Sequence, residues 1–178
     1  LSPADCTATV KATIAAAGID APVYLRLTGS MNNPIVYKED FDFEIGKAIE
    51  LRQGDDVAII ATGSMVHCAL KAAEHLEAMG ISASVLDMHT IKPLDITAVE
   101  AACKRKLLVT VEEHSIIGGL GSAVAEKLAL KTIHPPHLII GAPDVYPHAG
   151  DYVSLLDSCG LTPDKVAGKI LETYKELF

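Results

Sequence analysis

The stretch from Val109 to Ala129, VTVEEHSIIGGLGSAVAEKLA, constrains the fold more than any other part of the sequence. Residues 107–111 form an apolar, β-branched run, three glycines follow at positions 118, 119 and 121, and Val124 and Leu128 then recur at helical spacing. A strand, a glycine-rich turn and a helix in this order form the βα unit of a parallel sheet. Such sheets bind their ligands at the carboxyl ends of the strands. The sequence therefore predicts an α/β fold, with polar strand ends gathered at one edge.

The same alternation continues along the chain. We expect strands at 22–27, 47–51, 57–61, 81–88, 107–111 and 138–141, with helices before and between them, the first beginning at Ser2-Pro3 and ending near Ala17. A short Gly-Asp turn joins 47–51 to the next strand, and it is too short for a parallel crossover. We therefore expect a three-layer α/β/α sandwich around a mixed, mostly parallel five-stranded sheet, whose first strand, 47–51, is antiparallel.

Composition excludes several classes of partner. The net charge is −8 over 178 residues and no basic stripe is visible, which argues against nucleic acid and anionic membranes. No apolar run approaches the roughly 20 residues of a membrane span. The cysteines at 6, 68, 103 and 159 lack the spacing of a zinc site or a disulfide framework, so we expect a reducing, cytoplasmic compartment. Because the chain starts at Leu1, without a signal peptide, we expect a fragment or a processed chain.

The glycine-rich turn has two interpretations. A dinucleotide-binding turn requires G-x-G-x-x-G and an acidic residue about 20 positions later. Gly119 and Gly121 fit, but Val124 occupies the third glycine position and no suitable acid follows. The alternative is a turn that allows a close helix–strand approach or serves an interface. We favour this second interpretation and keep nucleotide binding as an alternative.

Polar residues follow two of the predicted strands. Glu112 and Glu113 are adjacent, so their side chains point to opposite faces of the strand and cannot act together on one substrate. One of them could act as a general acid or base, but we favour the alternative, in which such a carboxylate binds a lysine or a helix terminus. His114 has no visible partner, and Asp87 and His89 end another strand. The residues alone identify no catalytic group and no metal ligand, and leave the roles of Glu113, His114 and the 118–121 turn open.

Arg26 is the one charge in the apolar run PVYLRL. It comes just before Thr28-Gly29, near the end of the predicted strand, so its side chain could reach a site at the sheet edge. The alternative is a solvated or ion-paired arginine.

Four segments resemble, in order and spacing, the C-terminal domain of transketolase-like thiamine diphosphate enzymes. They are GDDVAIIATGSMVHCALKAAEHL, GISASVLDMHTIKPLD, VEEHSIIGGLGSAVAE and CGLTPDKV. The sequences of these segments are most similar to the C-terminal section of bacterial and archaeal split transketolases. The resemblance covers residues 46–178. It implies that residues 1–29 are the end of a preceding pyrimidine-binding domain and that residues 30–45 are a linker.

The resemblance also implies an activity. Enzymes of this family transfer a two-carbon ketol unit between sugar phosphates of the pentose phosphate type, using thiamine diphosphate and Mg²⁺. The cofactor site would lie in the preceding domains or an N-terminal subunit, so this chain alone would be inactive and would serve assembly, as a homodimer. Arg26 stands where the family has an arginine that binds the sugar phosphate. A strand at 22–27 without its own sheet would be poorly ordered or paired with another copy.

Three alternatives to this activity remain open at this point. Deoxyxylulose-phosphate synthase and the β subunit of 2-oxo acid dehydrogenases have a similar C-terminal domain and act on pyruvate or other 2-oxo acids. The third is a non-catalytic regulatory module.

Overall fold

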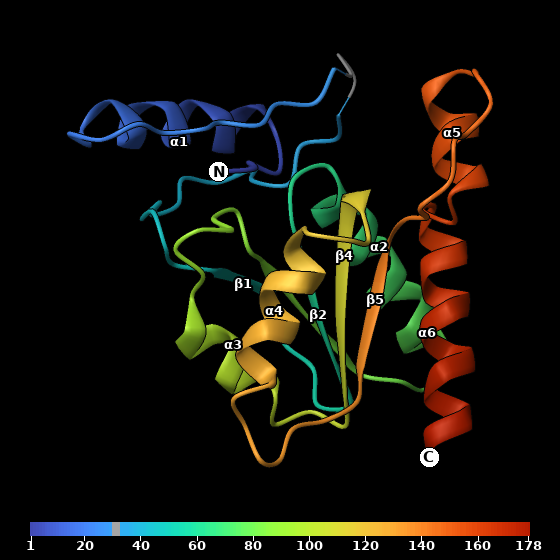
Figure 1. Ribbon diagram of the computed structural model, residues 1–178. Coiled ribbons are helices and arrows are strands. Elements are labelled where there is room, and N and C mark those ends of the chain that lie inside the picture. The colour runs from blue at the N-terminus through green and yellow to red at the C-terminus, as the bar shows by residue number, and fades with distance from the viewer. Residues whose placement is uncertain (30–32) are drawn as a thin grey trace.

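A five-stranded mixed sheet forms the centre of the computed structural model, which describes residues 1–29 and 33–178 (Figure 1). The strand order is β1-β3-β2-β4-β5; β1 is antiparallel to β3, and the remaining pairs are parallel. The bounds are β1 Ile49–Arg52, β2 Val57–Ala61, β3 Ala83–Asp87, β4 Leu107–Ser115 and β5 His137–Ala142. The predicted fold class is confirmed.

Helices cover both faces of the sheet. The bounds are α1 Cys6–Ala17, α2 Met65–Ala78, α3 Ile96–Ala102, α4 Leu120–Leu128, α5 Tyr152–Ser158 and α6 Pro163–Leu177. Side chains of α2 and α6 pack on one face, and side chains of α3 and α4 pack on the other. Figure 1 shows α1 and α5 beyond the carboxyl ends of the strands. None of the helices in the described residues is long and apolar enough to cross a membrane.

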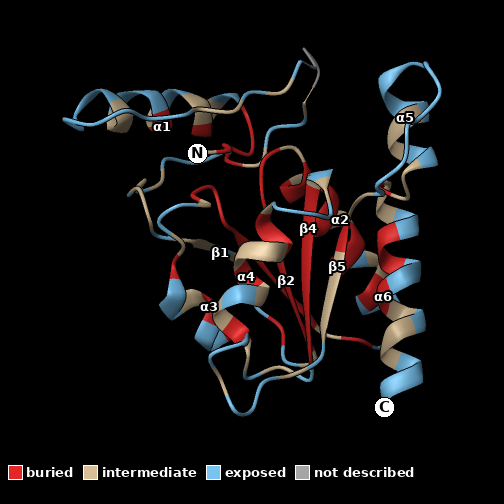
Figure 2. Cartoon of the chain, viewed as in Figure 1, coloured by how far each residue is buried: buried red, intermediate tan, exposed pale blue. Residues whose placement is uncertain are grey.

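Strand β2 connects the two halves of the core. All five of its residues, VAIIA, are buried, as the continuous apolar run predicts. Ile59 packs in the cluster with α2 and α6, and Ile60 packs in the cluster with α3 and α4. Figure 2 shows this burial along the central strands. Fully burying one such side chain contributes about 1.5 to 3 kcal/mol to the free energy of folding. The central strands are therefore stable elements that position the groups at their ends.

Strand β1 is antiparallel as expected, but it does not form a hairpin with β2. It pairs with β3, with Ile49 opposite Asp87. The connection from β1 to β2 therefore passes the start of β3, where a Cβ added at Gly54 would overlap the backbone of Ala83. A glycine is needed there because two stretches of backbone approach each other closely.

The first helix starts later than the Ser2-Pro3 pair predicts. Asp5 is the N-cap of α1, and its Oδ1 accepts a hydrogen bond from the N–H of Ala8 at 2.7 Å. The N–H of Ser2 instead donates to the carbonyl of His89, beyond the end of β3, at 2.8 Å. The chain start is thus held on the sheet edge, and the helix begins only after it.

Asp5 also fixes the segment that follows the first 29 residues. Its Oδ2 accepts hydrogen bonds from the N–H groups of Val36 and Tyr37, at 2.7 and 2.9 Å. Tyr37 is buried and stacks on Phe41, with 3.7 Å between ring centroids. Part of the predicted linker, 30–32, lies outside the described residues. The part that is described, 33–45, contains no helix or strand.

The predicted strand at 22–27 is wrong, because this segment joins no sheet. Its backbone partner is Leu1: the amino group of Leu1 donates to the carbonyl of Tyr24 at 2.7 Å, and the N–H of Arg26 donates to the carbonyl of Leu1 at 2.8 Å. These two bonds join the segment to a single residue, whereas a β-strand pairs with several consecutive residues of a neighbouring strand. Pairing with another copy stays a prediction.

Candidate functional site at the carboxyl ends of the strands

Glu112 caps the helix that follows its own strand. The residue is buried, with 2% of its surface exposed, and its two carboxylate oxygens accept hydrogen bonds from the N–H groups of Leu120 and Gly121, at 2.7 and 2.8 Å. These N–H groups are in the first turn of α4, where they have no partner within the helix and where the helix dipole favours a negative charge. Glu112 therefore binds a helix terminus, as one of the two interpretations predicts.

The glycines of the turn make room for this contact. A Cβ added at Gly119 would overlap the carboxylate of Glu112, and one added at Gly121 would overlap the side chain of Ile139 in β5. The N–H groups that a phosphate would need at this helix start are bonded to Glu112. The turn serves the close approach of α4, and its geometry does not support nucleotide binding.

Glu113 points to the other side of β4. Its Oε2 accepts hydrogen bonds from the hydroxyl of Ser64, the N-cap residue of α2, and from the hydroxyl of Tyr152 at 2.5 Å. Burial and the bond to Glu113 raise the pKa of Tyr152 to about 12. Within the described residues Glu113 therefore binds no lysine; its carboxylate accepts the side-chain hydroxyls of two residues at helix starts, the N-cap of α2 and the first residue of α5.

Arg26 lies beside this cluster. Its Nη2 donates to the backbone carbonyl of Glu113 at 2.8 Å, and within the described residues Arg26 forms no ion pair. The half-buried side chain also lines a largely apolar cavity of about 450 Å³, between the segment that contains Tyr24 and the loop that contains Ile91 and Lys92. The interpretation as an ion-paired arginine is therefore not supported among the described residues. One nitrogen of the guanidinium is bound to the carbonyl of Glu113, and the side chain lines the cavity.

Asp87 and His89 hold the segment that contains Tyr37 and Phe43 against the end of β3. The hydroxyl of Tyr37 donates to Asp87 Oδ2 at 2.7 Å, and the ring of His89 stacks on Phe43, with 4.1 Å between centroids. Burial raises the pKa of Asp87 to about 7 and lowers the pKa of His89 to about 4. Both residues are fully buried, so in this chain they stabilise a docked segment and do not face a cavity.

His114 does not join the cluster. It is exposed, and its Nδ1 bonds to the carbonyl of Ser115 at 3.0 Å. Over residues 1–29 and 33–178 the structure gathers no group of three His, Cys, Asp or Glu side chains that could hold a metal ion. The arrangement can hold a guanidinium in place beside a cavity, which suits the binding of an anion.

Sequence reasoning identified Arg26, Glu112 and Glu113 but not Ser64 or Tyr152. The order of residues at the end of β4 signals Glu112 and Glu113, and Arg26 is signalled as the one charge in an apolar run. Ser64 and Tyr152 are 49 and 39 residues away from Glu113, and no local pattern connects them.

Comparisons with known proteins agree on one family. The model of the transketolase C-terminal domain matches residues 46–166. A protein of Methanocaldococcus jannaschii described as a putative transketolase C-terminal section is 43% identical over 157 residues, which is 87% of this chain and 49% of that protein. A 1-deoxy-D-xylulose-5-phosphate synthase of Caldanaerobacter subterraneus is 35% identical over 178 residues, which is 99% of this chain and 29% of that protein.

A solved structure has nearly the same fold. It is described as a split gene transketolase in an inactive beta4 tetramer, and it is 39% identical with a TM-score of 0.89, over 99% of this chain and 57% of that one. The chain thus spans about half the length, or less, of the relatives it matches. The family model covers well over half of the chain, and the relatives agree with it. The chain therefore belongs to the transketolase family and contains its C-terminal domain.

Proposed function

We propose that this chain is part of a transketolase that transfers a two-carbon ketol unit between sugar phosphates, and that Arg26 binds the phosphate of the donor. One observation carries the proposal. Arg26 lines a cavity, has no ion-pair partner among the described residues, and is held by one nitrogen. The remaining donors of a guanidinium match the oxygens of a phosphate in a bidentate contact.

Thiamine diphosphate and Mg²⁺ do not fit the residues present in this chain. The one helix start in the described residues that follows a glycine-rich turn, that of α4, is bonded to Glu112. The described residues also offer no cluster of metal ligands. We therefore assign the cofactor to preceding thiamine-binding domains or to an N-terminal subunit, with residues 1–29 as the end of the preceding domain and 46–178 as the C-terminal domain.

The exposed side of the first 29 residues supports this assembly role. Val10, Ile14, Tyr24 and Leu27 are all more than half exposed, and they are large and apolar. Such a surface is unfavourable in water and suits a contact with the rest of the enzyme or with a second copy in a homodimer. Replacing Ile14 by Glu should weaken assembly, measured by sedimentation of the complete enzyme, whereas the same change at exposed Ile133 should not.

A donor test separates the proposed activity from its nearest alternative. The complete enzyme, with thiamine diphosphate and Mg²⁺, is supplied with a ketose phosphate or with pyruvate, each with an aldose phosphate acceptor. Ketol transfer from the ketose phosphate supports the proposal. Turnover of pyruvate alone contradicts it and favours a deoxyxylulose-phosphate synthase activity, which the similarity to such a synthase makes the second candidate.

The proposed role of Arg26 has its own test. Arg26→Ala should raise the KM for the ketose phosphate about tenfold or more, because a charged hydrogen bond of about 1.5 to 3 kcal/mol is lost. Arg105→Ala is the matched control. Arg105 also donates to a backbone carbonyl, that of Gly54 at 2.8 Å, but it lies at the opposite end of the sheet. An unchanged KM in Arg26→Ala would contradict the role.

A further inference from the structure

Glu113 joins four segments of the chain at one point. Its carboxylate accepts the hydroxyls of Ser64 and Tyr152, and its backbone carbonyl accepts Arg26 Nη2. These residues come from the β2–α2 turn, the start of α5, the end of β4 and the extended segment after α1. Arg26 is therefore held by a residue whose own side chain is fixed by two others.

The carbonyl that holds Arg26 has no partner in the sheet. Thr62, just after β2, donates its N–H to the carbonyl of Val111, and β2 pairs with β4 no further along. Because carbonyls alternate sides along a strand, the carbonyl of Glu113 points to the same side as that of Val111, past the end of β2. On its other side, the register of β4 with β5 shifts between Val111 and Ser115. The backbone at Glu113 thus lies in an irregular part of β4, where its side-chain contacts add to what holds it.

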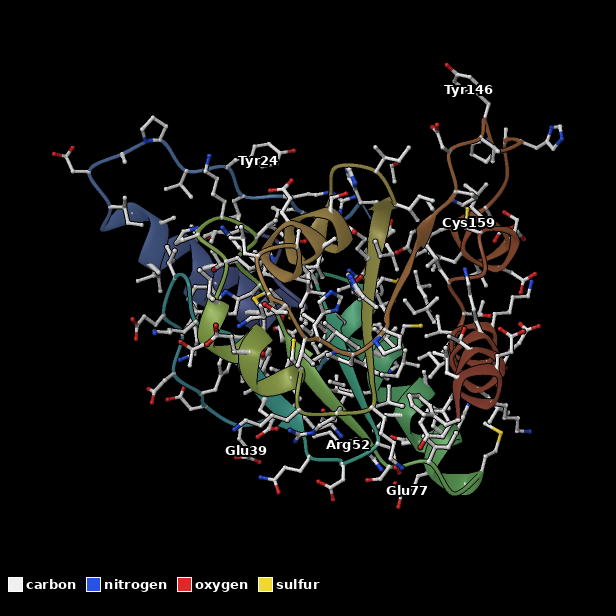
Figure 3. The ribbon with its side chains drawn as sticks, turned by 60° about the horizontal axis from the view of Figure 1, so that its bottom comes forward. Tyr24, Glu39, Arg52, Glu77, Tyr146 and Cys159 are labelled. Atoms are coloured by element: carbon white, nitrogen blue, oxygen red, sulfur yellow. The ribbon has the colours of Figure 1, made fainter. Side chains whose placement is uncertain are left out.

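Tyr152 supplies one of those contacts from an otherwise exposed part of the chain. It is the first residue of α5, a helix without a fully buried residue, and it follows the exposed segment 143–151. Figure 1 shows α5 standing beyond the end of the sheet, and Figure 3 shows Tyr146 of the same segment pointing away from the molecule. The hydroxyl of Tyr152 therefore links this outer segment to the residue that holds Arg26.

We propose that Tyr152 and Glu113 are positioning residues for Arg26: the Tyr152 hydroxyl fixes the Glu113 side chain, and the Glu113 carbonyl orients the guanidinium toward the donor phosphate. The proposal rests on the function proposed above. A guanidinium has five N–H donors in a rigid fork, so fixing one nitrogen sets the direction of the others. The loss of this orientation weakens phosphate binding without removing the charge.

The test uses the complete enzyme and two donors, the ketose phosphate and the same ketose without its phosphate. Tyr152→Phe removes a single hydroxyl. It should raise the KM for the phosphorylated donor about three- to tenfold, as expected for the loss of one hydrogen bond, and leave kcat unchanged. The KM for the unphosphorylated donor should not change. Tyr146→Phe is the matched control, because Tyr146 is fully exposed in the same segment.

Substitution of Glu113 provides a second, graded measurement. Glu113→Ala should reproduce the KM increase, whereas Glu113→Gln should restore most of the wild-type value, because its amide oxygen still accepts the tyrosine hydroxyl. Equal changes for both donors in Tyr152→Phe, or no change for either, would overturn the positioning role. If Arg26→Ala raises the KM for the phosphorylated donor while Tyr152→Phe does not, only the positioning role fails. If Arg26→Ala changes neither donor, the proposed role of Arg26 fails as well.

Discussion

The two ends of the sheet carry polar contacts of very different character. At the carboxyl ends, Glu112 and Asp87 are buried, and each binds a group from another segment of the chain. At the amino ends, Lys106 pairs with Asp56 at 2.8 Å and Arg52 pairs with Glu77 at 3.2 Å, all at least partly exposed. Figure 3 shows Arg52 and Glu77 at the edge of the molecule opposite Tyr146.

The contacts at the two ends differ in their exposure to solvent and not in their length. An exposed ion pair exchanges good contacts with water for a similar contact with its partner, so it contributes little. A buried acceptor has no water to replace it, and its loss leaves its donors without partners. Contacts of nearly equal length should therefore contribute very unequally to stability.

The largest effect is expected at Glu112. Glu112→Ala leaves the N–H groups of Leu120 and Gly121 without partners and should lower the free energy of unfolding by about 2 to 5 kcal/mol. Urea unfolding measures this as a shift in the midpoint with little change in slope. Glu112→Gln retains one good acceptor and should lose less. A loss below about 1 kcal/mol in the alanine variant would remove the distinction between the two ends.

The pH dependence of stability should depend on burial at the same end. The pKa of His89 is about 4 when folded and about 6.5 when unfolded, so stability falls as pH drops from 6.5 toward 4. The pKa of Asp87 is about 7 when folded and 3.8 when unfolded, so its contribution falls as pH rises through that same range. The two groups oppose each other.

Asp87→Asn should therefore make the decline of stability with falling pH steeper, as measured by urea midpoints between about pH 4 and 7. Asn still accepts the hydroxyl of Tyr37, and Asp144→Asn, at an exposed position, is the control. His137, near the amino end of β5, also has its pKa lowered to about 4 by burial and adds to the decline in both proteins. If the urea midpoint of Asp87→Asn varied with pH as it does in the wild type, Asp87 would not oppose His89.

The smallest effect is expected at Lys106. Its bonds to Asp56 and to the hydroxyl of Tyr174 raise the pKa of the lysine, yet the ammonium group is in solvent. Lys106→Met should leave the urea midpoint near the wild-type value, and added salt should change the wild type as little. A loss as large as that of Glu112→Ala would show that exposure does not separate the two ends.

The sequence predicts the layers of this fold better than the contacts that cross them. The run VAIIA and the spacing of Val66, Ala69 and Ala73 in α2 indicate buried strand and helix faces from local period alone. The pairing of β1 with β3 could not be predicted in this way. The short turn after β1 suggests a hairpin with β2, whereas the observed partner, β3, comes later in the chain.

In the candidate site, too, local patterns could be predicted from the sequence and long-range contacts could not. The sequence places Glu112 and Glu113 near the end of a strand, since glycines and polar residues follow an apolar run there. It singles out Arg26 as the one charge in an apolar run, but the strand predicted around it does not form. It cannot indicate that Arg26 reaches Glu113, 87 residues later, or that Tyr152 does so from the far end of the chain. Such contacts depend on strand order and on where β2 ends.

Asp5 links the first helix to the interior of the sheet through a series of hydrogen bonds. It binds the first turn of α1 through Ala8 and the linker through Tyr37, and Tyr37 in turn binds Asp87 inside the core. These hydrogen bonds form one continuous series from the first turn of α1 to the end of β3. We therefore expect the orientation of α1 to depend on Tyr37 and Asp87, although both residues lie far along the chain from the helix.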